Sequence, residues 1–360
     1  MNSRYSVAIR EQEGDAVLQL RDERMDCTVE IAAAIGMNVI RYTRGRGDII
    51  LPPPSLAQLK ALPTRFGIPV LSPPGRTSGG KFQYAGRSYQ LPLTHHLHHL
   101  HGELNRLPWQ VERHGASATD GAFVEAVYAY HRDPQRHAYF PHKLEYRLRY
   151  RLKDGDLFLE GSAHNTGEEI VPFALGFHPY FVFAGDLAHV LLYAPPATEW
   201  PKDREGQAIG PPEPTPLTLS LAQGVPLAEL KSSLSFLRLE PYPAAAPGQA
   251  HIPGQEAPPG PTAAFGSAAV PGPAAPQPAS QNCWIIEDGY AARQIRLQTD
   301  TLFSNLVLFK PPWANAISLE PHTCVPDAFN LPWDSGLTGA RGLEAGSSQV
   351  FSWSIQVKER

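Results

Sequence analysis

Two short stretches far apart in the chain carry the residues best suited to proton chemistry. Residues 176–181 read GFHPYF and place His178 among aromatic side chains, and residues 318–323 read SLEPHT and contain Glu320. An imidazole titrates near neutral pH and a free carboxylate is ionised there, so the two groups can donate and accept a proton respectively. The sequence therefore predicts an acid–base pair, provided that the fold brings the two stretches together.

Each of these residues also has an ordinary structural interpretation. His178 alone fits a buried core histidine equally well, because burial disfavours its charged form unless a carboxylate is near. Glu320 follows residues 316–319 (AISL), which we expect to form a strand, and a glutamate buried there needs a partner. A salt bridge to one of the many arginines would satisfy it as well as a catalytic role would.

Two further stretches contain candidate binding residues. Five histidines lie in residues 95–101, of which His101 is the last, and Arg76 lies in the glycine-containing run 73–80. The histidine run invites a metal interpretation, but metal sites usually draw ligands from elsewhere in the chain, so we expect no functional metal there. An arginine fork suits recognition of neighbouring sugar hydroxyls as well as carboxylates.

The elements that must position these residues are mainly strands. Residues 146–152, 351–357, 295–298 and 18–21 alternate apolar and polar side chains, which is typical of half-buried antiparallel strands. The arginines within 146–152 fit a solvated strand face better than a phosphate clamp. We expect short helices at 55–62, capped by Ser55, and at 221–231. Many strands and 37 prolines predict an all-β fold, a large antiparallel β-sandwich with few short helices.

Residues 241–282 interrupt this pattern, since Pro, Ala and Gly dominate them. Such a composition cannot build a core, so we expect a disordered insertion. The candidate residues lie on both sides of it and must share one cleft, which favours one β-sandwich domain spanning 1–360 over two domains.

Composition narrows the functional class. The net charge is −4 with no cluster of basic residues, so we expect no nucleic-acid partner. Three cysteines without a CxxC pair argue for a reducing compartment, and no long apolar run suggests a membrane. We expect a cytoplasmic protein, a monomer or weak dimer.

The order of the motifs resembles that of the aldose 1-epimerase (galactose mutarotase-like) family. Arg76 comes first, then His101 and the Pro108-Trp109 pair, then His178-Pro179-Tyr180-Phe181, and finally Glu320-Pro321. The resemblance covers roughly residues 65–335 apart from the insertion. It implies a galactose mutarotase-like supersandwich that binds a small sugar and needs no cofactor.

The resemblance also implies roles for the site residues. Glu320 matches the base that takes the anomeric proton, His178 the acid at the ring oxygen, and His101 a histidine that binds and polarises the sugar. Arg76 matches a substrate-binding arginine. Independently of the resemblance, the aromatic rings of Trp109 and Tyr180 suit either an apolar face for the sugar or a place in the core. The family's sugar-binding aspartate falls near the insertion, and Asp288 is our candidate for it.

These observations predict an aldose 1-epimerase that interconverts the α and β anomers of a hexose. The sequence leaves open which sugar is used and whether it is phosphorylated. A non-catalytic sugar-binding protein on the same fold is the alternative from another class. A polysaccharide-processing enzyme would be expected to carry a further domain.

Overall fold

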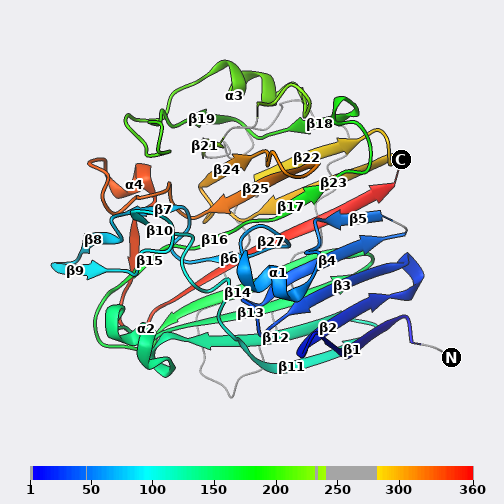
Figure 1. The fold of residues 1–360 in the computed structure, drawn as a ribbon, viewed down its shortest axis with the longest axis horizontal. Helices are drawn as coiled ribbons and strands as arrows, with labels where there is room; N and C mark the ends of the chain where they lie inside the picture. Colours follow the sequence, from blue (N-terminus) through cyan, green and yellow to red (C-terminus); the bar gives the residue numbers. More distant parts are fainter. Residues whose placement is uncertain (1–2, 46, 232–233, 241–281, 360) are drawn as a thin grey trace, which may run out of the picture.

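The computed structural model describes residues 3–45, 47–231, 234–240 and 282–359. Within these ranges two large antiparallel sheets face each other (Figure 1). The first has twelve strands, in the order β1 (Tyr5–Gln12), β2 (Asp15–Asp22), β3 (Cys27–Ala32), β4 (Asn38–Arg44), β5 (Gly47–Ile50), β17 (Tyr180–Val182), β25 (Ala316–His322), β24 (Asn305–Phe309), β21 (Leu234–Leu239) and β19 (Ala197–Glu199), with β16 (Gly176–Phe177) and β6 (Val70–Leu71) attached.

The second sheet has nine strands in the described chain. Their order is β11 (Gln110–Ser117), β12 (Gly121–Ala129), β13 (Leu144–Lys153), β14 (Asp156–Asn165), β27 (Ser348–Glu359), β23 (Arg293–Thr299), β22 (Asn282–Asp288), β18 (Val190–Tyr193) and β20 (Val225–Pro226). Three smaller ribbons pair β7 (Arg76–Ser78) with β10 (His98–Leu100), β8 (Lys81–Tyr84) with β9 (Arg87–Gln90), and β15 (Val171–Phe173) with β26 (Arg341–Leu343).

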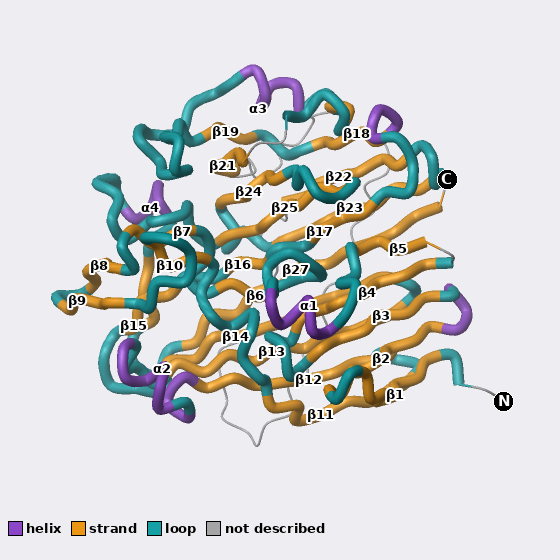
Figure 2. The backbone as a smooth tube through the Cα atoms, viewed as in Figure 1, coloured by secondary structure: helices purple, strands orange, loops and turns teal. Residues whose placement is uncertain are grey.

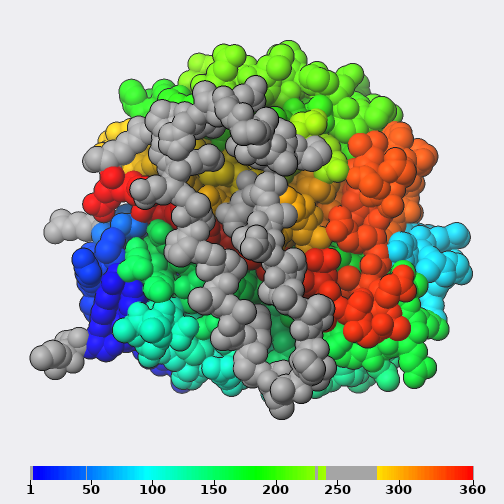
Figure 3. Space-filling view, turned by 180° about the vertical axis from the view of Figure 1, so that it is seen from behind, coloured from blue at the N-terminus to red at the C-terminus, as the bar shows by residue number. Residues whose placement is uncertain are grey.

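Helices are few and short in the described residues, as Figure 2 shows: α1 (Leu56–Ala61), α2 (Pro134–Tyr139), α3 (Pro216–Leu221) and α4 (Ser335–Thr338). None of them is long and apolar enough to cross a membrane. Seen from behind, the β8–β9 hairpin projects at one edge of the molecule, far from the N-terminal strands (Figure 3). The all-β sandwich predicted from the strand patterns is therefore confirmed.

The individual predictions mostly hold. The alternating segments at 18–21, 146–152, 295–298 and 351–357 lie in β2, β13, β23 and β27. Ser55 caps α1 by accepting a hydrogen bond from the Gln58 backbone N–H. The helix expected at 221–231 was wrong: α3 ends at Leu221, and Gly224 with φ +95° leads into β20. A left-handed residue breaks a helix, so the chain turns there. The 241–282 segment, apart from Asn282, lies outside the described residues.

The arginines of β13 form ion pairs on the outer face of the second sheet. Arg149 approaches Glu125 at 3.3 Å and Asp120 at 3.5 Å, and Arg147 approaches Glu112 and Glu145. Neighbouring carboxylates therefore occupy the guanidinium groups, and the phosphate-clamp interpretation has no support.

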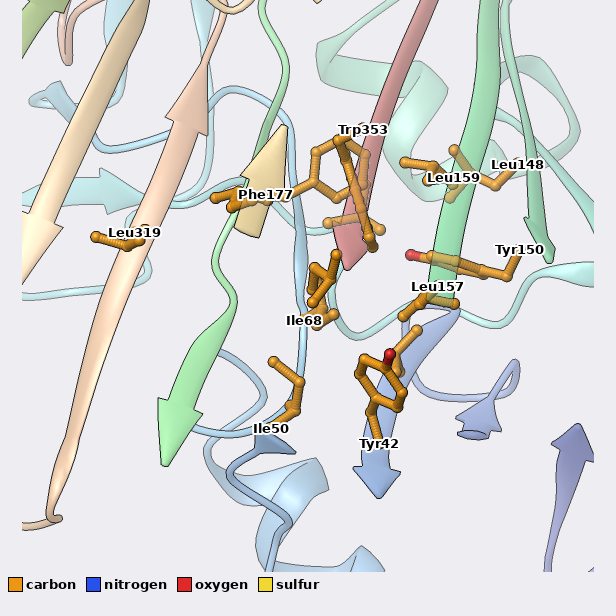
Figure 4. Packing of buried hydrophobic residues seen from close by; sticks show 14 of the residues in the cluster. Tyr42, Ile50, Ile68, Leu148, Tyr150, Leu157, Leu159, Phe177, Leu319 and Trp353 are labelled. Atoms are coloured by element: carbon orange, nitrogen blue, oxygen red, sulfur yellow. The ribbon is translucent and has the colours of Figure 1, made fainter. Parts of the chain in front are cut away.

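The main core fills the space between the two sheets. Figure 4 shows Tyr42, Ile50, Phe177 and Leu319 of the first sheet facing side chains of the second, which include Leu148, Tyr150, Leu157, Leu159 and Trp353. Because successive side chains of a strand point to opposite faces, each first-sheet strand that sends an apolar residue into this core also sends a residue to the outer face. That outer face carries the candidate site.

Replacing Leu159 with Ala should test how far the fold depends on this contact between the sheets. Leu159 is 1% exposed in the core, so the variant should lose about 2–5 kcal/mol in the free energy of unfolding. Urea denaturation gives the value, with Val350→Ala on the exposed surface of β27 as a control expected to change by less than about 0.5 kcal/mol. Equal effects of the two substitutions would contradict the assigned core.

Candidate active site

Strand β25 forms one side of the site, because its side chains alternate between the two faces of the sheet. Ile317 and Leu319 enter the main core, so Ser318, Glu320 and His322 share the opposite face. Glu320 lies opposite Val307 on the neighbouring β24, and loops cover this face so closely that Glu320 is 1% exposed. A carboxyl group buried to this degree needs partners, and its neighbours provide them.

His178 reaches Glu320 from the turn between β16 and β17. Antiparallel pairing of both short strands with β25 places Gly176 opposite His322 and Tyr180 opposite Ser318, which leaves the intervening His178 beside Glu320. Its Nε2 lies 3.2 Å from Glu320 Oε1. The fold thus joins the two stretches whose residue types suit an acid–base pair.

Ser318 fixes the orientation of the His178 ring. The Ser318 hydroxyl donates to the Pro179 carbonyl at 2.9 Å, so its oxygen is free to accept from His178 Nδ1 at 2.7 Å. A neutral His178 therefore carries its hydrogen on Nδ1 and turns the lone pair of Nε2 toward Glu320.

Tyr180 supports the same ring from a second side. Its ring stacks on His178 with centroids 4.5 Å apart and an angle of 17°, and its hydroxyl lies 3.3 Å from His178 Nε2. Tyr180 is 1% exposed, and its ring and hydroxyl help to hold the imidazole in place.

His101 approaches the pair from the loop after β10. Its ring meets that of His178 edge to face, with centroids 5.3 Å apart. His101 has a left-handed backbone with φ +60°, and Gly102 follows with φ +64°. Position 102 requires a glycine, because a Cβ there would lie 1.9 Å from the Ser72 carbonyl oxygen. The Gly75 N–H donates to His101 Nδ1 at 3.3 Å, which leaves the neutral ring with its hydrogen on Nε2 as a donor.

Burial decides the charge states of these groups. It raises the pKa of Glu320 well above its usual value and lowers the pKa of His178 well below its own. Burial, together with the nearby charge of Arg76, lowers the pKa of His101 to about 3. Both shifts favour the form in which the single proton between His178 and Glu320 resides on the carboxyl group, with His178 and His101 neutral.

Donor atoms of His101, His178 and Glu320 lie within 4.8 Å of one another, a spacing that can hold a metal ion. The same closeness suits proton transfer, and the 3.2 Å contact lets one proton satisfy both His178 and Glu320. The other histidines of the 95–101 run do not join this group, because β10 is short and directs His99 into a separate buried position.

The remaining residues expected at the site divide into two groups. Arg76 lies on β7 near His101, with its guanidinium donating to the Glu205 carbonyl oxygen. Trp109 is 4% exposed within the main core and its indole N–H donates to Leu104. Asp288 pairs with Arg293 at 3.0 Å in the β22–β23 hairpin. The structure does not bring Trp109 or Asp288 into contact with the histidine–glutamate cluster.

The sequence interpretation missed two residues of the cluster, Ser318 and His322. His322 Nε2 lies 3.3 Å from Glu320 Oε2, and Ser318 bonds to His178. Their signal was the period of two around Glu320, which places polar residues on both sides of it on one strand face.

Known structures share this fold over the whole chain. A galactose mutarotase-like protein from Clostridium acetobutylicum superposes with a TM-score of 0.82 at 18% identity, covering 100% of both chains. Galactose 1-epimerase from Lactobacillus acidophilus NCFM gives 0.71 at 15% identity, covering 99% of both. At these identities the likeness establishes the fold, which is that of a galactose mutarotase-like β-sandwich.

Sequence similarity establishes the family. Residues 19–208 match the sequence model of aldose 1-epimerase, which is more than half of the chain. The chain belongs to the aldose 1-epimerase family. The matched range includes Arg76, His101 and His178, whereas Glu320 lies beyond it and joins them through the geometry of β25.

A curated relative agrees over a shorter range. The uncharacterized protein YihR of Escherichia coli K12 is 32% identical over 111 residues, which are 30% of this chain and 33% of that protein. The chain thus matches about a third of the length of this relative.

The tautomer of His178 can be observed directly. Nitrogen-15 NMR of the labelled protein at pH 7 should show a neutral His178 with its hydrogen on Nδ1, because Ser318 accepts there and burial opposes the charge. Ser318→Ala should change the His178 signals, while exposed His114 should keep its own. An imidazolium spectrum for His178 in the unliganded protein at pH 7 would contradict the assignment of the shared proton to Glu320.

The ion pair of Asp288 leads to a second expectation. Asp288→Asn removes one partner of a buried pair, so the variant should lose about 3–5 kcal/mol in the free energy of unfolding, measured in urea. Asp26→Asn, at an exposed turn, is the control. Unchanged stability combined with weakened sugar binding would contradict this expectation and support Asp288 as a sugar-binding residue.

Proposed function

We propose that this protein is an aldose 1-epimerase, with Glu320 as the base and His178 as the acid that interconvert the α and β anomers of a free hexose. The single observation that carries the proposal is the contact between His178 Nε2 and Glu320 Oε1 at 3.2 Å, with the His101 ring against His178. Membership of the aldose 1-epimerase family supports it.

The reaction needs two proton transfers at neighbouring oxygens of the sugar. The Glu320 carboxylate takes the proton of the anomeric hydroxyl as His178 Nε2 gives a proton to the ring oxygen, and the C1–O5 bond breaks. The open-chain aldehyde then rotates about its C1–C2 bond. Reversal of both proton transfers closes the ring on the other face, which restores both groups and yields the other anomer.

The active form of the pair is an ionised Glu320 beside a protonated His178. It has the same number of protons as the resting form, in which the carboxyl group is protonated, so the proton only has to cross the 3.2 Å contact. Ser318 favours the protonated imidazole, because its oxygen accepts from Nδ1–H and a charged donor makes a stronger hydrogen bond than a neutral one. The ratio of the two forms is independent of pH, and the pair titrates as a unit.

The shared proton determines what each limb of the profile of activity against pH reports. As pH rises, activity falls when the shared proton is lost, and that proton resides on Glu320. As pH falls, activity declines when a second proton binds, and His178 is the group that accepts it. The basic limb therefore reports the loss of the proton that the pair shares, and the acidic limb reports the binding of a second proton to the pair.

The other residues near the pair have supporting roles. Neutral His101 offers its Nε2–H to a sugar oxygen beside the anomeric centre, since Gly75 already satisfies Nδ1. Arg76 lies on the same side and can donate to further hydroxyls. Membership of the family favours a small sugar as the substrate and leaves the identity of the hexose open.

Polarimetry tests the proposal. The protein should accelerate the change in optical rotation of freshly dissolved α-D-glucose or α-D-galactose, and Glu320→Gln should lower that acceleration by ~10²–10⁴-fold because the base is removed. Glu11→Gln, an exposed substitution on β1, controls for the change of charge. No acceleration of either sugar by the folded wild type, or full activity in Glu320→Gln, would refute the assignment.

A further inference from the structure

His322 is a buried titratable group beside the acid–base pair, and the proton transfers above do not use it. It lies two residues beyond Glu320 on the same face of β25 and is fully buried. Its Nε2 is 3.3 Å from Glu320 Oε2, while the other carboxyl oxygen, Oε1, faces His178. The carboxyl group of Glu320 is thus held between two imidazoles, one at each oxygen.

The surroundings of His322 leave Glu320 as its partner. Within the described residues, neither ring nitrogen of His322 has an aligned hydrogen bond, and neither does Glu320 Oε2. Buried polar atoms normally have partners, and catalytic hydrogen bonds are often loose before substrate binds and tighten afterwards. The tautomer of His322 with its hydrogen on Nε2 can donate to Glu320 Oε2, and it leaves only the lone pair of Nδ1 without a partner.

The fold holds the His322 ring in place through Gly176. The two residues pair across β16 and β25, and a Cβ on Gly176 would lie 2.5 Å from His322 Cδ2. Pro74 closes the same side, since its Cβ would lie 2.9 Å from that added atom. The ring therefore fills a space that only a glycine leaves open.

His322 acts in its neutral form. Burial lowers its pKa well below the usual value, and the charge of His101 would lower it further. The titratable groups near it are Glu320 on its own strand, His178 from the β16–β17 turn and His101 from the loop after β10. Among these, Glu320 is the hydrogen-bond acceptor within reach.

We propose that His322 is a positioning residue that donates its Nε2–H to Glu320 Oε2, which aims Oε1 at the anomeric hydroxyl and stabilises the ionised carboxylate. The inference rests on the proposed epimerase function but assigns His322 no contact with the sugar. A donor at Oε2 favours the form in which the shared proton sits on His178, so it raises the fraction of active enzyme.

The test compares His322→Leu with His322→Gln, because a Gln side-chain amide can donate where Nε2 does and Leu cannot. In His322→Leu the plateau rate of mutarotation should fall ~10–100-fold, with KM close to that of the wild type, because a hydrogen bond to a charged group is lost. The basic limb of the profile should move to higher pH, since an ionised Glu320 has lost a donor. His322→Gln should keep most of the wild-type rate, and its basic limb should lie near that of the wild type.

Two further variants keep the test informative. Gly176→Ala should reproduce the effects of His322→Leu by displacing the ring, which covers the case in which Leu fails to fold. His114→Leu, at an exposed position of β11, is the matched control and should behave as the wild type. Equal losses in the Leu and Gln variants with an unmoved basic limb, or wild-type rates in His322→Leu, would overturn the inference.

A second measurement separates this inference from the proposed function. Carbon-13 NMR of the Glu320 carboxyl group, titrated without sugar, should give a higher pKa in His322→Leu than in the wild type or His322→Gln. An inactive wild type with this pattern would refute the epimerase and leave the role of His322 toward Glu320 standing. An unchanged Glu320 titration would refute that role whatever the activity.

Discussion

The site depends on one constraint, the burial of a carboxyl group and an imidazole in contact with each other and with almost no water. An isolated carboxylate at the position of Glu320 would be too costly to bury, so its neighbours must share one proton with it and supply hydrogen bonds. His178 meets one oxygen and His322 approaches the other, while Ser318 and Tyr180 fix the His178 ring. The demands of a single buried group thus account for much of the polar structure on this sheet face.

The sandwich makes this arrangement possible because one strand serves two purposes. Leu319 and Ile317 anchor β25 in the core between the sheets, and the alternate residues Ser318, Glu320 and His322 then project from the other face in a fixed register. Pairing of β16 and β17 with the same strand positions His178. Precise placement of His178 and Glu320 therefore follows from the backbone pairing of buried strands.

The sequence predicted the elements whose signal is local. Period-two patterns located strands such as β13 and β27, the Ser55 cap located α1, and the family motifs identified His101, His178 and Glu320. Partnerships across the fold had no local signal. Nothing near Ser318 indicates that it will meet a histidine 140 residues earlier, and an indole such as that of Trp109 fits a core position and a sugar platform equally well. Asp288 did have a local partner, since a short turn to Arg293 favours a hairpin ion pair.

Burial also bears on how the proposed epimerase could work when the shared proton favours Glu320 over His178. In water at pH 7 a glutamate is mostly ionised, which is the form of the base that mutarotation needs. Solvent would, however, screen the charges of both the glutamate and the histidine. In the proposed mechanism the ionised form is less populated, yet once formed it would act on the sugar through fixed dipoles in a buried setting, where electrostatic interactions are stronger. The hydrogen bond from His178 to Ser318 and the one proposed from His322 to Glu320 act on opposite ends of that ion pair. Both reduce the free energy needed to separate the charges without exposing either group to solvent.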